Sequence, residues 1–210
     1  MTIAQSLITF LAAAGLLTLT PGLDTAMVLR AATAEGRRPA AFAALGIGLG
    51  CLVWGASVAL GLGALLTASR VAFTVLKWVG AVYLVFLGAS LILSPRRTVA
   101  LDAGPAPRDR RPLDALRRGL LTNLLNPKVG VFYVSFLPQF TPPGMAMAPY
   151  VFMLACIHVV MGLIWSGALI AATAPIGRYL AKPGVATVLD RLTGCVFIAF
   201  GARLALARRG

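Results

Sequence analysis

Long hydrophobic segments dominate this chain, and short polar stretches separate them. Hydropathy delimits six such segments, with approximate bounds at residues 3–29, 40–66, 71–93, 119–140, 149–172 and 186–206. About 20 apolar residues in a helix cross the ~30 Å hydrocarbon core of a bilayer. Ala and Leu are frequent, and the segments lack the alternation of a membrane β-strand. The pattern therefore predicts an all-α membrane protein with six transmembrane helices.

The composition strengthens this interpretation. Only 12% of the residues are charged and 59% are hydrophobic, whereas an ordinary soluble domain carries about 25% charged residues. The net charge of +13 comes from 19 Lys and Arg against six acids. These basic residues stand at the ends of the apolar segments, as the positive-inside rule and attraction to anionic lipid require. We therefore expect membrane lipid, and not nucleic acid, as the partner of the basic residues.

The distribution of basic residues between the segments predicts an orientation. The second loop carries only Arg70 and the fourth carries none, while the first, third and fifth loops are basic: Arg30, Arg37 and Arg38; Arg96, Arg97, Arg108, Arg110, Arg111, Arg117 and Arg118; Arg178 and Lys182. With the basic loops inside the cell, both termini lie outside. Arg208 and Arg209 at the C-terminus oppose this orientation.

The chain, residues 1–210, is predicted to be one transmembrane domain made of two similar halves. Repeat 1 covers about 3–93, a flexible cytoplasmic linker 94–118, and repeat 2 about 119–206. Three motifs recur in the same order: residues 15–18 and 119–122, 54–56 and 165–168, and 80–91 and 194–204. A repeat of three spans inserts its second copy upside down. The two halves thus predict two inverted three-helix repeats, with a substrate site where they meet.

Each half contains a proline where its first helix is expected to break. Proline is unfavourable inside a helix but fits its first position behind a Ser, Thr, Asp or Asn cap. Thr20-Pro21-Gly22 and Asn126-Pro127 therefore predict two helix restarts, capped by Thr20 and Asn126. The start of a helix carries unpaired N–H groups and a partial positive charge, which suit a carboxylate. A pair of packing kinks is the alternative.

Charged and amide side chains accompany these breaks. Asp24 is the only acidic residue between Met1 and Ala34, and acids within a membrane span mark a proton or substrate path. Lys128 is a candidate counter-charge for Asp24 or for a substrate carboxylate, with snorkelling to the interface as the alternative. Asn123 lies one turn before Asn126 and is expected to present a second amide to the same cavity.

Together these motifs resemble the LysE/RhtB family of lysine and homoserine–threonine exporters. The resemblance covers nearly the whole chain and rests on residues 20–24, 46–50, 123–128 and 136–140. It implies a bacterial inner-membrane, multi-pass exporter of amino acids or related metabolites, driven by the proton-motive force. It also implies that Thr20, Pro21, Gly22, Asp24, Asn126, Pro127 and Lys128 line the transport site. Leu23 stands where the family usually has a second proline, and this departure should make the restart less rigid.

Other function classes fit the sequence less well. A hydrolase needs paired acids or a nucleophile with a base, whereas Asp24 could pair only with Asp190 and the single histidine is His158. A thiol electron carrier would need cysteines in the first and fourth segments, which have none. Export of another small solute or ion is the alternative function. No metal or organic cofactor is expected, and a homo-oligomer is compatible with the sequence, which identifies neither the substrate nor the coupling ion.

Overall fold

The computed structural model describes residues 1–68, 70–94, 112–172 and 183–206, and this part of the chain is helical apart from short turns. The long helices are α3 (Arg37–Ala68), α4 (Arg70–Leu93), α7 (Met147–Ala171) and α9 (Pro183–Leu206). Shorter helices form the two interrupted regions: α1 (Ile3–Leu19), α2 (Leu23–Ala34), α5 (Pro112–Leu124), α6 (Pro127–Val131), η1 (Phe132–Phe136) and η2 (Leu137–Phe140). The all-helical prediction is confirmed for these residues.

Within the residues that the structure describes, two helices are long and apolar enough by themselves to cross a membrane, over Arg37–Gly61 and Met147–Ala171. The pair α1 and α2 passes the same test as one bent span. These findings agree with the predicted transmembrane character, while the number of six spans and their inverted arrangement stay predictions. The linker was predicted to extend over 94–118, but its last residues are helical in the structure, because α5 begins at Pro112. Residues 95–111 lie outside the described part.

The first interrupted helix bends by 51° between α1 and α2. Pro21 has no N–H to donate to the preceding turn, so the α-helical ladder cannot pass through it. α1 ends at Leu19, and α2 begins at Leu23 behind Gly22, whose backbone is extended with φ −140° and ψ −168°. The predicted break is therefore present at the predicted proline.

The second interrupted helix starts as α5 and stops after Leu124. Asn126 is the N-cap of α6, where its side chain accepts a hydrogen bond from the backbone N–H of Lys128, and Pro127 begins α6. The continuation is irregular: η1 is a π-helix and η2 a 3-10 helix. Pro138 in η2 removes another backbone donor, which explains why regular α-helix does not resume.

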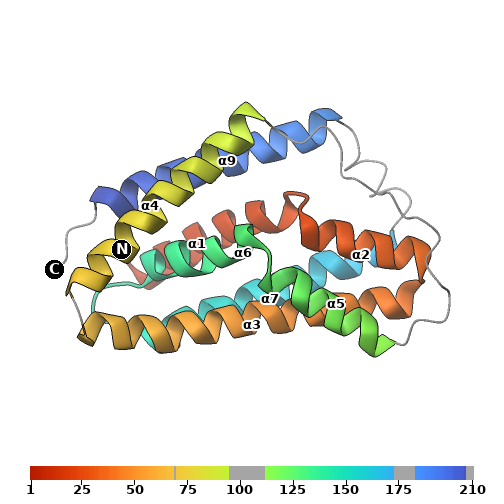
Figure 1. Cartoon of the computed structure of the whole chain (residues 1–210), viewed down its shortest axis with the longest axis horizontal. Helices are drawn as coiled ribbons and strands as arrows, with labels where there is room; N and C mark the ends of the chain where they lie inside the picture. The colour runs from red at the N-terminus through yellow and green to blue at the C-terminus, as the bar shows by residue number, and fades with distance from the viewer. Residues whose placement is uncertain (69, 95–111, 173–182, 207–210) are drawn as a thin grey trace.

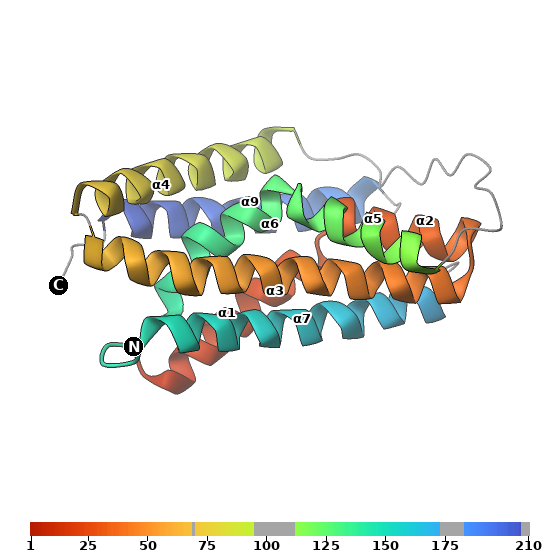
Figure 2. The same cartoon turned by 60° about the horizontal axis from the view of Figure 1, so that its bottom comes forward.

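The helices form an elongated bundle in which α3 and α7 run side by side (Figure 2). α4 and α9 pack against each other along most of their length and form a separate pair on one flank (Figure 1). α5 packs closely on α3, because Gly46 and Gly119 leave no side chain between them. A Cβ at Gly46 would collide with the backbone oxygen of Leu116, and one at Gly119 with that of Ala43. Two helices can therefore approach each other closely at these glycines.

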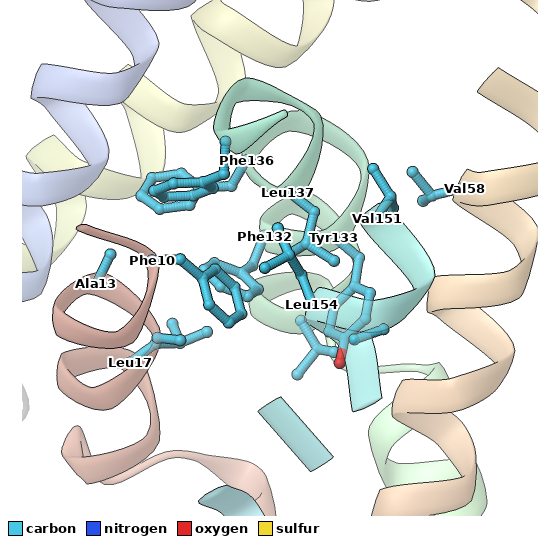
Figure 3. Close-up of a cluster of buried hydrophobic side chains, with 14 of the residues drawn as sticks. Phe10, Ala13, Leu17, Val58, Phe132, Tyr133, Phe136, Leu137, Val151 and Leu154 are labelled. Atoms are coloured by element: carbon cyan, nitrogen blue, oxygen red, sulfur yellow. The ribbon is translucent and has the colours of Figure 1, made fainter. Parts of the chain in front are cut away.

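The main hydrophobic core surrounds η1 and η2. Phe132, Phe136 and Leu137 are fully buried, and they pack against Phe10 and Leu17 of α1 and against residues of α7 (Figure 3). Ser6 Oγ donates to the backbone oxygen of Phe140 at 2.5 Å, and Tyr150 Oη donates to Ser6 Oγ at 2.8 Å. These bonds join α1, η2 and α7 at one end of the bundle, and thereby hold both interrupted helices against α7.

Candidate functional site

A cavity of ≈ 80 Å³ lies where the two interrupted helices meet. The end of α1 and the start of α2 form one wall, and Asn126, Lys128 and Val129 form the facing part. α3 and α7 complete it with one face each. The residues that carry polar side chains in these walls are Thr18, Thr20, Asp24, Thr25, Cys51, Asn126, Lys128, His158, Trp165 and Ser166.

Asp24 occupies the first turn of α2, and two amides of the other half hold its carboxylate. Asn123 Nδ2 donates to Asp24 Oδ2 at 2.8 Å, and Asn126 Nδ2 donates to Asp24 Oδ1 at 3.3 Å. The start of a helix also favours a negative charge through the helix dipole. The acid is therefore fixed in position at the junction of the two halves.

Lys128 reaches back from α6 to the end of α1. Its Nζ donates to the backbone oxygen of Leu17 at 3.3 Å and to that of Thr20 at 3.2 Å. These are carbonyls of the last turn of α1, which lack helical partners and carry a partial negative charge. Lys128 thus places a positive charge in the cavity wall beside Gly22, where an added Cβ would lie 3.7 Å from Nζ.

The predicted cap at Thr20 is wrong. Thr20 ends α1, its Oγ1 donates to the backbone oxygen of Leu16 at 2.6 Å, and it shares a 2.5 Å hydrogen bond with Thr193 Oγ1. Its hydroxyl therefore serves α1 and α9, and α2 starts two residues later behind Gly22 without a side-chain cap. The N–H groups of the first turn of α2 keep the unpaired character expected of an uncapped helix start.

The structure assembles most of the predicted site residues. Thr20, Gly22, Asp24, Asn126 and Lys128 line the cavity. Asn123 is fully buried behind Asp24 and contacts Gly50, so it supports the carboxylate without being part of the cavity wall. Pro21 and Pro127 contribute the two breaks, by their place between α1 and α2 and at the start of α6.

The sequence did not predict the contribution of α7. One face of α7 lines the cavity with His158, Gly162, Trp165 and Ser166. Residues three or four positions apart lie on the same face of a helix. His158 Nδ1 shares a 3.0 Å hydrogen bond with Tyr133 Oη, which joins α7 to η1. The sequence shows polar side chains at helical spacing in this segment, but which neighbour this face of α7 contacts depends on how the helices pack.

Aliphatic side chains cover the rest of the cavity. They come from α1, α3, α6 and α7 and include Leu17, Ile47, Val129, Val159, Leu163 and Leu169. Gly162 lies among them, and an added Cβ at this position would meet no atom within 4 Å. Among the described residues, no group of three or more His, Cys, Asp or Glu side chains is close enough to hold a metal ion. The cavity thus combines one acid and one lysine with apolar walls.

The family model for LysE-type translocators matches residues 16–208. The chain belongs to this family. A leucine efflux protein of Klebsiella pneumoniae is 32% identical to it, over 94% of this chain and 93% of that one. A homoserine/homoserine lactone efflux protein of Salmonella typhi is 30% identical, over 95% of each chain. A membrane protein of Vibrio cholerae is 33% identical, over 95% of this chain and 96% of that one. No solved structure is a significant match.

Membership of the LysE family makes this protein a transmembrane translocator and not an enzyme. The match begins at Leu16 in the last turn of α1, and it includes α2, the second interrupted helix and all the residues that line the cavity. The expected resemblance is therefore confirmed, and the cavity between the breaks is the candidate site of this translocator.

Proposed function

We propose that this LysE-family protein exports neutral amino acids, which bind as zwitterions in the cavity between the two breaks. The observation that carries the proposal is the Asp24 carboxylate, which both Asn123 and Asn126 hold at the cavity wall. It is a fixed acceptor for the substrate ammonium group. The positive charge of Lys128 and the uncapped start of α2 lie beside it and suit the substrate carboxylate.

The walls support a substrate with an uncharged side chain. Asp24 and Lys128 balance the two charges of the backbone of an amino acid, and the remaining surface is mainly aliphatic. A charged side chain would lose its hydration there without gaining a partner, which is costly. The relatives named as efflux proteins for leucine and for homoserine agree with this class.

The transport cycle that we propose is proton-coupled alternating access. Both halves contain an interrupted helix followed by long helices, which supports two inverted repeats that rock around the site. Asp24 is the residue that we assign to the coupling proton, because it is the acid in the cavity wall. The protein would act in the bacterial inner membrane with both termini outside, and this orientation rests on the basic loops.

Efflux from cells tests this proposal. Cells that overproduce the protein are loaded with radiolabelled neutral, acidic and basic amino acids, and efflux is followed with and without a protonophore. We expect faster efflux of neutral amino acids, which the protonophore abolishes. Equal efflux from cells with and without the protein for the whole panel would reject amino-acid export and leave another small solute as the cargo. Efflux that survives the protonophore would reject proton coupling alone.

A further inference from the structure

A second cavity lies on the other side of the α5–α6 break. It has a volume of ≈ 530 Å³ and lies between α3, α4 and the segment from Leu124 to Ser135. Asn126 lines both cavities, so its side chain forms part of the wall between them. Residues that follow Asn126 face one or the other: Lys128 and Val129 face the first cavity, and Gly130 and Val131 the second.

The two cavities follow one another along α3. Ile47 and Cys51 line the first cavity, and Trp54 lines the second. Steps of four and three residues keep these side chains on one face of the helix, and three residues advance it by about 4.5 Å. Arg37 and Arg38 mark the end of α3 that the positive-inside rule places in the cytoplasm. From that end, a solute reaches the first cavity before the second.

Each cavity contains a tryptophan whose indole N–H is buried. Within the part of the chain that the structure describes, neither Trp54 Nε1 nor Trp165 Nε1 has a hydrogen-bond partner. A buried donor without an acceptor costs free energy. The two residues belong to the matching motifs 54–56 and 165–168 of the two halves. The second cavity thus repeats a feature of the first.

We propose that the second cavity is the exit half of the translocation path, and that the amino acid passes from the first cavity into it when Asn126 moves aside. This inference rests on the proposed export of amino acids. The competing occupant is a lipid acyl chain, since Leu125 and Val79 at the cavity are 78% and 61% exposed. A water-filled exit path and a lipid-filled groove differ in the reagents that reach Val134 in the cavity wall.

Thiol labelling distinguishes the two occupants. V134C places a thiol in the second cavity, and V82C places one on the surface of α4 outside both cavities, where Val82 is 65% exposed. Membranes that carry either variant are treated with a positively charged methanethiosulfonate or with the lipid-soluble N-ethylmaleimide, and mass spectrometry locates the modified residue. We expect the charged reagent to modify V134C roughly tenfold faster or more than V82C, because charged groups enter hydrocarbon at a high cost. Modification of V134C by the maleimide alone would overturn the proposal.

A cavity-filling variant gives the second measurement. V134F narrows the second cavity but leaves Asp24, Lys128 and the walls of the first cavity unchanged. We expect efflux to fall about tenfold, because the larger aromatic side chain obstructs the path. We also expect L-leucine to shift the melting temperature of purified V134F as much as that of the unmodified protein. Unchanged efflux of V134F, with the variant folded by size-exclusion chromatography, would also overturn the proposal.

The two proposals fail in different experiments. The labelling contrast between V134C and V82C needs no transport measurement, so it reports on the second cavity even if the efflux panel identifies another cargo. If the unmodified protein exports neutral amino acids and V134C resists the charged reagent, then the exporter stands and the exit path is rejected.

Discussion

Asn123 donates a hydrogen bond of 2.8 Å to the carboxylate of Asp24, across 99 residues of sequence. The bond joins α5 to the first turn of α2, and therefore one half of the chain to the other. Asn126, at the start of α6, makes the parallel contact at 3.3 Å. The acid of the first break is thus held by the amides of the second, which explains why two separated proline motifs create one site.

Substitution of Asp24 tests its role as the substrate and proton acceptor. D24N keeps the size of the side chain but removes its charge, and a hydrogen bond to a charged group is worth about 1.5–3 kcal/mol. We expect efflux of neutral amino acids to fall roughly 10–100-fold. D114N is the matched control, since Asp114 lies in the first turn of α5 and does not line the cavity. Undiminished efflux in D24N would remove Asp24 from the mechanism.

The contact between Asp24 and Asn123 is open to a double-mutant cycle. N123D places two acids in contact, and we expect it to lower both the melting temperature in detergent and the efflux rate. D24N/N123D restores one acid and one amide at this contact, and we expect the melting temperature to recover. A double variant whose loss equals the sum of the two single losses would show that the two side chains do not interact.

The packing of α5 on α3 predicts an intolerant glycine. G46A forces a methyl group against the backbone oxygen of Leu116, and overpacking of this kind costs about 1–3 kcal/mol or more. We expect a lower melting temperature in detergent and a smaller yield of folded protein. G61A is the control, because a Cβ at Gly61 of α3 meets no atom within 4 Å. Equal melting temperatures for the two variants would contradict the close approach of α3 and α5.

An ion pair joins the two halves away from the cavity. Arg118 Nη2 of α5 contacts both carboxylate oxygens of Glu35 at 2.7 and 2.5 Å, and the Glu35 side chain is only 6% exposed. R118A leaves this buried acceptor unsatisfied, and we expect a loss of about 1–3 kcal/mol in the free energy of unfolding. The neighbouring exposed Arg117 provides the control R117A, which should change stability little. A loss of equal size in both variants would mean that the ion pair contributes nothing specific.

Much of the fold was predictable from the sequence, because local physical rules set it. The length of each hydrophobic segment predicted the position of a helix. The predicted segment 40–66 corresponds to α3, Arg37–Ala68, and the segment 149–172 to α7, Met147–Ala171. Proline chemistry located both breaks. The prediction failed at Thr20, where a local capping rule competed with a tertiary contact, since the hydroxyl bonds Thr193 on α9.

Local sequence patterns are enough to identify a helical membrane protein of the LysE family with two interrupted helices, an acid beside one and a lysine beside the other. The partners of these side chains depend on how the helices pack. The tertiary structure placed Lys128 on the carbonyls at the end of α1, Asn123 behind Asp24, and the polar face of α7 in the cavity. Helix formation and helix breaking depend on neighbours within a few residues, whereas these contacts join segments about a hundred residues apart and exist only after the helices have packed.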